Sequence, residues 1–173
     1  MQHAEQLFSM TEIDQQISRL AKQLNRDYES LNPLVLCVMN GAVVTLGHLL
    51  PKLTFPLQLD YIHATRYCDK RIGADLVWQS RPTSELNDRH VLLIEDIFDE
   101  GYTLDALRAF CLEAGASSVR CLALVNKLHD RKQAQLPEYL GLEVADRYVF
   151  GFGMDVDGYW RNAPGIFAVR EDS

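Results

Sequence analysis

The sequence has few cysteines and no metal-ligand pattern of histidines, which narrows the chemistry that it can support. None of the four cysteines belongs to a CxxC pair, so we expect buried or incidental free thiols in a reducing compartment. The five histidines show no metal-ligand spacing. The cysteines are Cys37, Cys68, Cys111 and Cys121, and the histidines are His3, His48, His63, His90 and His129.

Long apolar runs and clusters of basic residues are also missing. No apolar run approaches membrane-spanning length, and residues 1–14 lack the basic start and apolar core of a signal peptide. We therefore expect a cytoplasmic protein without a membrane partner. With 17 basic and 24 acidic residues the formal net charge is −7, which argues against general nucleic-acid binding. An anionic substrate is still compatible with this charge, because backbone amides can bind phosphate.

What the chain does contain is a series of short, strongly apolar segments. At 173 residues and 47% hydrophobic content it is long enough for one domain, residues 1–173, with a sizeable core. Continuous apolar runs of this length are typical of buried parallel strands. The buried strands are expected at 34–39, 91–94 and 119–125, and segments with helical spacing follow the first two at 42–53 and 103–114.

This alternation of buried strand and helix predicts an α/β fold with a mostly parallel, doubly wound sheet flanked by helices. In such a sheet, ligands bind at the carboxyl ends of the strands. Residues 11–28 form an amphipathic pattern that Ser9 or Thr11 could cap, and Pro51 should kink or end the helix of residues 42–53 near Leu50. Further strands are expected at 57–67, 75–80, 139–144, 148–152 and 166–169.

Residues 91–104, VLLIEDIFDEGYTL, contain the most informative pattern of the chain. Glu95 and Asp96 follow the expected strand, and an acidic loop with one glycine then leads into a helix. The start of a helix, a glycine and the Thr103 hydroxyl together make a seat for a phosphate. The carboxylates suit ribose hydroxyls or a Mg²⁺ ion that bridges to phosphates. In the alternative interpretation, Asp99 or Thr103 merely caps an ordinary acidic helix start.

The segment EDIFDEGYT closely resembles the phosphoribosyl-pyrophosphate (PRPP) motif of type I phosphoribosyltransferases, and Asp99 is typical of the hypoxanthine-guanine branch. The resemblance implies a hood made by the terminal segments, Mg²⁺ as cofactor and a homodimer or homotetramer. It implies transfer of the phosphoribosyl group from PRPP to hypoxanthine or guanine, with Asp99 as general base or acid at purine N7. The PRPP loop would be residues 95–103, with Glu95 and Asp96 near ribose and metal and with Asp99, Glu100, Gly101, Tyr102 and Thr103 around the 5′-phosphate.

Two earlier segments fit the same resemblance. Asn40 and Gly41 match a loop that binds pyrophosphate through its backbone, although a basic residue often stands at the position of Asn40 in the family. A flap at residues 66–80 would close over the reaction and exclude water, with Arg66 and Tyr67 at its base. A simple Asn-Gly turn and a plain β-hairpin are the alternatives for these two segments.

The second half of the chain carries the residues that would recognise the purine. Lys127 lies at the end of a strand, where the family has a lysine that binds the exocyclic oxygen of hypoxanthine or guanine. Adenine has an amine there, which Lys⁺ cannot satisfy. Residues 147–162, RYVFGFGMDVDGYWRN, resemble the C-terminal signature of the family, within a purine-binding hood segment at 146–162. The resemblance assigns base stacking to Tyr148, reading of the purine edge to Arg147 and Val149, a Mg²⁺ contact to Asp155 and a pyrophosphate contact to Arg161.

Three other functions are compatible with parts of this pattern. The enzyme could use xanthine, because contacts to the purine 2-position are largely made by the backbone. A phosphoribosyltransferase-fold regulator could bind nucleotides and RNA without turnover, although the acidic charge argues against it. An inactive sugar-phosphate-binding domain would not need both Asp99 and Lys127.

Overall fold

The computed structural model describes residues 4–66 and 76–170. Within these ranges, one six-stranded sheet runs in the order β4-β3-β2-β5-β6-β7, and its five strands from β3 to β7 are parallel while β4 pairs antiparallel with β3. A smaller antiparallel sheet has the order β1-β9-β8. The elements are β1 (Ala4–Ser9), α1 (Met10–Asp27), β2 (Leu34–Val38), α2 (Ala42–Leu49), a 3₁₀ turn (Leu50–Lys52), β3 (Gln58–Arg66), β4 (Leu76–Ser80), β5 (His90–Phe98), α3 (Tyr102–Glu113), β6 (Ser118–Leu128), β7 (Tyr139–Ala145), β8 (Val149–Phe150) and β9 (Gly165–Val169).

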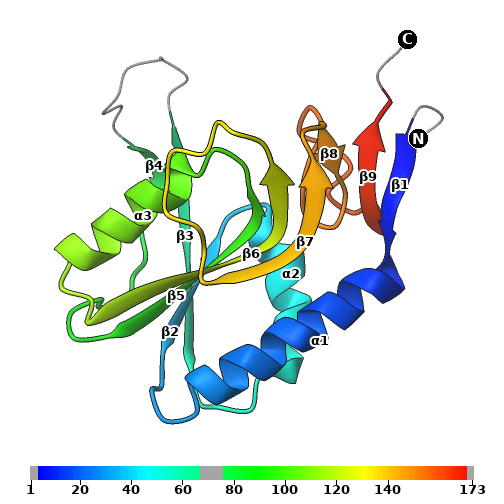
Figure 1. The fold of residues 1–173 in the computed structure, drawn as a ribbon. Helices are drawn as coiled ribbons and strands as arrows, with labels where there is room; N and C mark the ends of the chain where they lie inside the picture. Colours follow the sequence, from blue (N-terminus) through cyan, green and yellow to red (C-terminus); the bar gives the residue numbers. More distant parts are fainter. Residues whose placement is uncertain (1–3, 67–75, 171–173) are drawn as a thin grey trace.

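Helices cover both faces of the large sheet, as the predicted α/β class requires (Figure 1). Helices α1 and α2 pack on one face in a hydrophobic cluster that includes Ile17, Leu46 and Leu124. Helix α3 packs on the opposite face with Leu107, and Leu93 of β5 lies in the same cluster. Because β2, β5 and β6 are buried from both sides, their sequences are continuously apolar. The prediction of a mostly parallel, doubly wound sheet is confirmed.

The predicted helix starts and stops are explained by local chemistry. Ser9 caps α1, since its side chain accepts a hydrogen bond from the N–H of Glu12, and the Glu12 carboxylate bonds back to the N–H of Ser9. Helix α2 ends at Leu49, and Pro51 lies in the 3₁₀ turn that follows. The helix predicted for residues 42–53 is therefore shortened where Pro51 was expected to end it.

The hood predicted from the terminal segments corresponds to the sheet β1-β9-β8, which lies beyond β7 and above the end of α1 (Figure 1). Strand β1 at Ala4–Ser9 was not expected, because its sequence AEQLFS has little alternation of apolar and polar residues. It is held instead by pairing with β9, for example between Ala4 and Val169. The two ends of the chain thus build one small sheet.

Two strands are longer than their apolar runs. Strand β5 continues to Phe98, and its ladder with β6 includes the pairs Glu95–Ala123 and Phe98–Asn126. Glu95 and Asp96 therefore lie within the strand, not in the loop behind it. Strand β6 likewise includes Lys127. The predicted ends were too early because ladder hydrogen bonds join backbone groups and do not depend on apolar side chains.

Candidate active site

The carboxyl ends of β2 and β5 meet at Gly41 and Asp96. A Cβ atom at position 41 would collide with the Asp96 carboxylate, and a Cβ atom at Gly153 would collide with the Gly41 carbonyl oxygen. Gly41 has a φ of −63°, so its glycine is needed for space and not for an unusual backbone conformation. The peptide bond between Met39 and Asn40 is cis. The turn after β2, the carboxylates of β5 and the C-terminal segment are thus in direct contact.

Glu95 and Asp96 form a pair of adjacent carboxylates in which charge is costly. Asp96 is buried, and its Oδ1 atom accepts a hydrogen bond from the N–H of Ile97 at 2.7 Å. Burial raises the pKa of Glu95 well above its ordinary value, and the neighbouring Asp96 charge raises it further. Burial also raises the pKa of Asp96, which the charge of Arg161 opposes in part. The pair therefore favours a ligand that brings positive charge.

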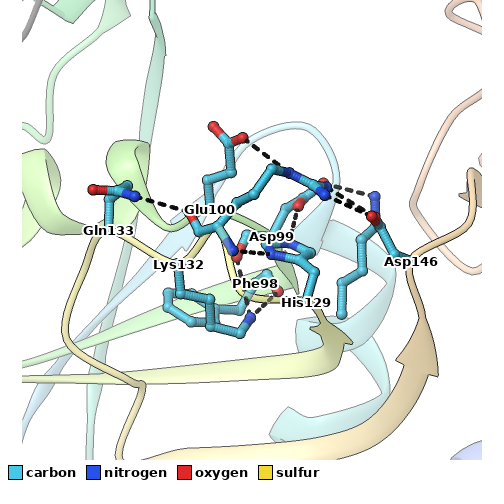
Figure 2. Close-up of polar contacts among 9 residues, drawn as sticks. Phe98, Asp99, Glu100, His129, Lys132, Gln133 and Asp146 are labelled. Atoms are coloured by element: carbon cyan, nitrogen blue, oxygen red, sulfur yellow. Dashed lines mark hydrogen bonds and ion pairs between the residues drawn. The ribbon is translucent and has the colours of Figure 1, made fainter.

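Asp99 lies just beyond β5 and is held by two side chains from the end of β6 (Figure 2). Lys127 Nζ lies 2.7 Å from Asp99 Oδ2, and His129 Nε2 lies 2.6 Å from Asp99 Oδ1. Burial alone would raise the pKa of Asp99, but the hydrogen bonds from Lys127 and His129 outweigh it and hold the pKa below its ordinary value. Asp99 is therefore an ionised carboxylate at neutral pH, with 43% of its side chain exposed.

The loop from Glu100 to Thr103 leads into α3. Gly101 is the residue that precedes the helix, it has a φ of 88°, and no side chain caps the helix there. The alternative interpretation that Asp99 or Thr103 serves as the helix cap is therefore wrong. A Cβ atom at Gly101 would collide with the Phe98 ring, so this turn requires glycine for both space and conformation. Tyr102 is the first residue of α3, and the Glu100 carboxylate lies 3.6 Å from Arg131.

Four residues that follow β6 hold the loop between β5 and α3, and the sequence did not predict them. We call His129, Arg131, Lys132 and Gln133 the clamp. Lys132 Nζ donates to the carbonyl oxygens of Phe98 and Asp99, and the N–H of Gln133 donates to the carbonyl oxygen of Glu100 (Figure 2). One available signal was the position of His129 two residues after Lys127, since residues two apart in an extended chain point to the same side.

The C-terminal segment brings Asp155 and Arg161 together. Arg161 Nη2 lies 2.6 Å from Asp155 Oδ1, and Arg161 Nη1 donates to the carbonyl oxygen of Gly153 at 2.7 Å. In the described part of the chain, no three His, Cys, Asp or Glu side chains are grouped to hold a metal ion. Asp155 therefore makes an ion pair here and does not join Glu95 and Asp96 in a three-carboxylate cage.

The remaining predicted residues differ in their environments. Tyr148 is 55% exposed and available for stacking, whereas Val149 is buried in β8. The Arg147 side chain bonds to Glu5 and to the carbonyl oxygen of Val169, so it ties the hood together. Asn40 is exposed. Arg66 ends β3, while Tyr67 and most of the predicted flap lie outside the described residues.

Glu95 and Asp96 fit magnesium as a metal that is shared with a substrate. Mg²⁺ prefers hard oxygen ligands and usually keeps several waters, binding through one or two carboxylates and substrate phosphates. Two adjacent carboxylates with raised pKa values match this preference, and the residues that the structure describes add no third metal ligand beside them. The donor set is therefore that of a metal–phosphate complex, not of a structural metal site.

A mostly parallel sheet of this order, with an acidic strand end, a glycine turn before α3 and a separate hood, is the architecture of a type I phosphoribosyltransferase. The model of the phosphoribosyl transferase domain family matches residues 3–157, and the chain belongs to this family. No helix in the described residues is long and apolar enough to cross a membrane.

Relatives in this family are named for purine substrates. The chain is 32% identical to the hypoxanthine-guanine-xanthine phosphoribosyltransferase of Tritrichomonas foetus over 166 residues, which cover 95% of this chain and 91% of that protein. It is 30% identical to the hypoxanthine-guanine phosphoribosyltransferase of Streptococcus thermophilus, covering 96% and 93%. A solved hypoxanthine-guanine-xanthine phosphoribosyltransferase shares 31% identity at a TM-score of 0.88, covering 99% of this chain and 100% of that chain. A Staphylococcus aureus hypoxanthine phosphoribosyltransferase, at 23% identity and a TM-score of 0.91, covers 96% and 91% and supports the fold alone.

Proposed function

We propose that the protein is a purine-salvage enzyme that transfers the phosphoribosyl group from PRPP to hypoxanthine or guanine, giving IMP or GMP and pyrophosphate. The observation that carries this proposal is the pairing of Asp99 with Lys127 at 2.7 Å. A 6-oxopurine with a proton on N7 presents a donor at N7 and an acceptor at O6 on the same edge. A carboxylate beside an ammonium group matches these two groups, whereas adenine presents an amine to Lys127.

Each site residue has a role in this reaction. N9 of the purine attacks C1′ of PRPP, the bond from C1′ to the pyrophosphate oxygen breaks, and the proton on N7 passes to Asp99. The lowered pKa of Asp99 keeps it ionised and ready to accept this proton. Tyr148 stacks on the base, with Arg147 and Val149 beside it, and the loop of residues 99–103 binds the 5′-phosphate. Most of the catalytic effect comes from positioning and electrostatics.

The leaving pyrophosphate needs positive charge and backbone donors. Arg161 would supply a charge, since its guanidinium already opposes the rise in the pKa of Asp96 that burial causes, and the backbone of Asn40 and Gly41 would supply donors. Glu95 and Asp96 would hold Mg²⁺, and the ion, when bound, would supply positive charge that offsets the charge of the pyrophosphate. Asp155 contributes by orienting Arg161 through their 2.6 Å ion pair, and a direct metal contact from Asp155 stays a prediction.

The wider setting follows from the same proposal. A cytoplasmic location suits an enzyme with three buried free thiols among the described residues, Cys37, Cys111 and Cys121. One domain comprising residues 1–173, a flap at 66–80, a homodimer or homotetramer, and no membrane or nucleic-acid partner also belong to this proposal. Xanthine is a further candidate substrate because the name of the Tritrichomonas foetus relative includes it.

A pyrophosphate-release assay tests the proposal directly. The protein is given PRPP and Mg²⁺ with hypoxanthine, guanine, xanthine or adenine in separate reactions. We expect turnover with hypoxanthine or guanine and none with adenine. Turnover with adenine would overturn the role of Lys127, and turnover with xanthine would extend the substrate range. A folded protein that binds PRPP but turns over no base would instead be the nucleotide-binding regulator.

A further inference from the structure

His129 uses both of its ring nitrogens in hydrogen bonds. Its Nε2 atom lies 2.6 Å from Asp99 Oδ1, and its Nδ1 atom lies 3.1 Å from the backbone nitrogen of Arg131. A backbone N–H can only donate, so Nδ1 must be the unprotonated nitrogen that accepts. The proton of the neutral ring is therefore on Nε2, and Nε2 donates to Asp99. Only 4% of the His129 side chain is exposed, so water does not compete for these bonds.

We propose that His129 is a positioning residue for Asp99, a neutral donor that holds one carboxylate oxygen and leaves the other to the purine. This inference rests on the proposed phosphoribosyl transfer and deepens it. Lys127 holds Oδ2 of Asp99 at 2.7 Å. When the purine O6 atom engages Lys127, Oδ2 becomes free to accept the N7 proton, while His129 keeps Oδ1 in place. The two oxygens of Asp99 thus have separate tasks.

The rest of the clamp fixes the place from which His129 acts (Figure 2). Arg131, whose N–H sets the ring tautomer, is anchored by two bonds to Asp146 at 2.7 and 3.0 Å. Lys132 and Gln133 bind backbone carbonyls of the loop that carries Asp99. The donor and acceptor of the His129–Asp99 bond are thus fixed to each other by other contacts. Such support is what a precisely oriented catalytic carboxylate requires.

Two substitutions of His129 test the hydrogen-bond donor and the bulk of the ring independently. In His129→Gln, the side-chain amide nitrogen can reach the position of Nε2 and donate to Asp99, but it cannot titrate. In His129→Phe, a ring of similar size remains and the donor is lost. A hydrogen bond to a charged group is worth about 10- to 100-fold, so we expect His129→Phe to lower kcat by about 10-fold or more. The KM for PRPP should stay within about twofold, because Lys132 and Gln133 still hold the backbone of the loop in the variant.

We expect His129→Gln to recover most of this loss and to keep the shape of the pH–rate profile, because the ring donates without exchanging its proton. The charged and titratable groups near the ring are Asp99, Lys127, Arg131, Lys132 and Asp146, and all are retained in both variants. A wild-type kcat for His129→Phe, or a His129→Gln enzyme as slow as His129→Phe, would overturn the positioning role. Loss of one limb of the pH profile in His129→Gln would identify His129 as a proton carrier and would also overturn it.

A measurement without turnover distinguishes this inference from the proposed function. The ¹⁵N chemical shifts of the histidine rings report which nitrogen carries the proton, and the His129 signal is assigned by its absence in His129→Gln. We expect the Nε2–H tautomer at pH 7, and an Nδ1–H tautomer would overturn the inference even in an active enzyme. A wild-type protein without activity toward any base would reject the proposed function while this tautomer was still observed. Thermal unfolding of both variants checks that they fold.

Discussion

Carboxylates at opposite ends of the same sheet differ in what neutralises them. Glu138 stands at the amino end of β7, where its carboxylate accepts two bonds from Arg108 at 2.8 and 3.2 Å and one from the N–H of Cys121 at 2.7 Å. Burial would raise the pKa of Glu138, but these bonds outweigh it and lower the pKa. Glu95 and Asp96 lie toward the carboxyl end of the parallel strand β5, and their pKa values are raised.

This difference in pKa separates a carboxylate that stabilises the fold from carboxylates that are suited to binding a ligand. At the amino end, the chain supplies an arginine with only 12% of its side chain exposed, so the charge of Glu138 stabilises the fold. At the carboxyl end, Arg161 offsets the charge of Asp96 only in part, and under the proposed function a ligand neutralises the rest. Asp99 lies between these cases, since Lys127 and His129 lower its pKa while part of its carboxylate stays open to a substrate.

The largest effect is expected from Asp99→Asn. The amide cannot accept the purine N7 proton, so we expect kcat to fall by about 10²- to 10⁴-fold, or roughly 3–5 kcal/mol of transition-state stabilisation. Steady-state kinetics with hypoxanthine measures this loss. The melting temperature should change by only a few degrees, because the position is partly exposed.

The matched control for this change is Asp130→Asn, which makes the same substitution at an exposed position in the loop after β6. Its kcat should match that of the wild type. An unchanged kcat in Asp99→Asn with every base would show that Asp99 does not transfer a proton. Asp99 would then be, like Glu138, a carboxylate whose hydrogen bonds only stabilise the fold.

Glu138→Gln should have the opposite outcome, with lost stability and normal catalysis. The substitution removes a charge from a hydrogen-bonded pair and leaves Arg108 uncompensated, at a cost of about 1–3 kcal/mol. For a protein of this size that corresponds to a decrease of roughly 3–10 °C in melting temperature. Glu143→Gln, an exposed site on the same strand, is the control and should melt like the wild type. A large loss of kcat in Glu138→Gln would contradict the idea that carboxylates at the amino end of the sheet serve stability and those at the carboxyl end serve catalysis.

The pH dependence of Glu138→Gln has a definite sign. Because the pKa of Glu138 is lowered in the folded state, its carboxylate stabilises the fold above the ordinary pKa of about 4.3. This contribution is lost as the pH falls through the lowered value. The difference in unfolding free energy between wild type and variant should therefore be full at pH 7 and shrink toward pH 3. Urea unfolding at several pH values measures it.

The sequence predicted the fold well because the fold depends on patterns within short segments. Continuous apolar runs identified β2 and the buried parts of β5 and β6, and Pro51 marked the end of α2. The ends of β5 and β6 were wrong because backbone pairing continues through polar residues such as Glu95 and Lys127. Strand β1 was missed because its partner, β9, is far away in the sequence.

The site was predictable where one segment carries it and not where distant segments meet. The carboxylates and the glycine turn of residues 95–103 stand together in the sequence. The ion pair between Lys127 and Asp99 and the burial of His129 arise only when β5 and β6 become neighbours. Glu138 and Arg108 are 30 residues apart, so no local pattern marked this pair as structural.

Glu95→Gln should have the smallest effect, but it tests the comparison between the two ends of the sheet most sharply. We expect it to stabilise the folded protein and to impair the enzyme. The raised pKa of Glu95 means that its ionised form costs folding free energy. Without added metal, the variant should therefore match the wild type near pH 4, where both side chains are neutral. As the pH rises through the folded pKa of Glu95, the wild type loses stability and the variant does not.

At pH 8 in the presence of EDTA, we expect Glu95→Gln to be more stable by about 1 kcal/mol, which is roughly 2–4 °C in melting temperature. Adding Mg²⁺ and PRPP should reverse this order, because ligands stabilise the folded protein in proportion to their affinity and the wild type keeps the charge that they need. The KM for PRPP should rise in the variant. A melting temperature below that of the wild type in EDTA would mean that Glu95 is already neutralised within the protein. The carboxyl end of the sheet would then resemble the amino end, and the charge that favours Mg²⁺ and PRPP would have to come from Asp96 alone.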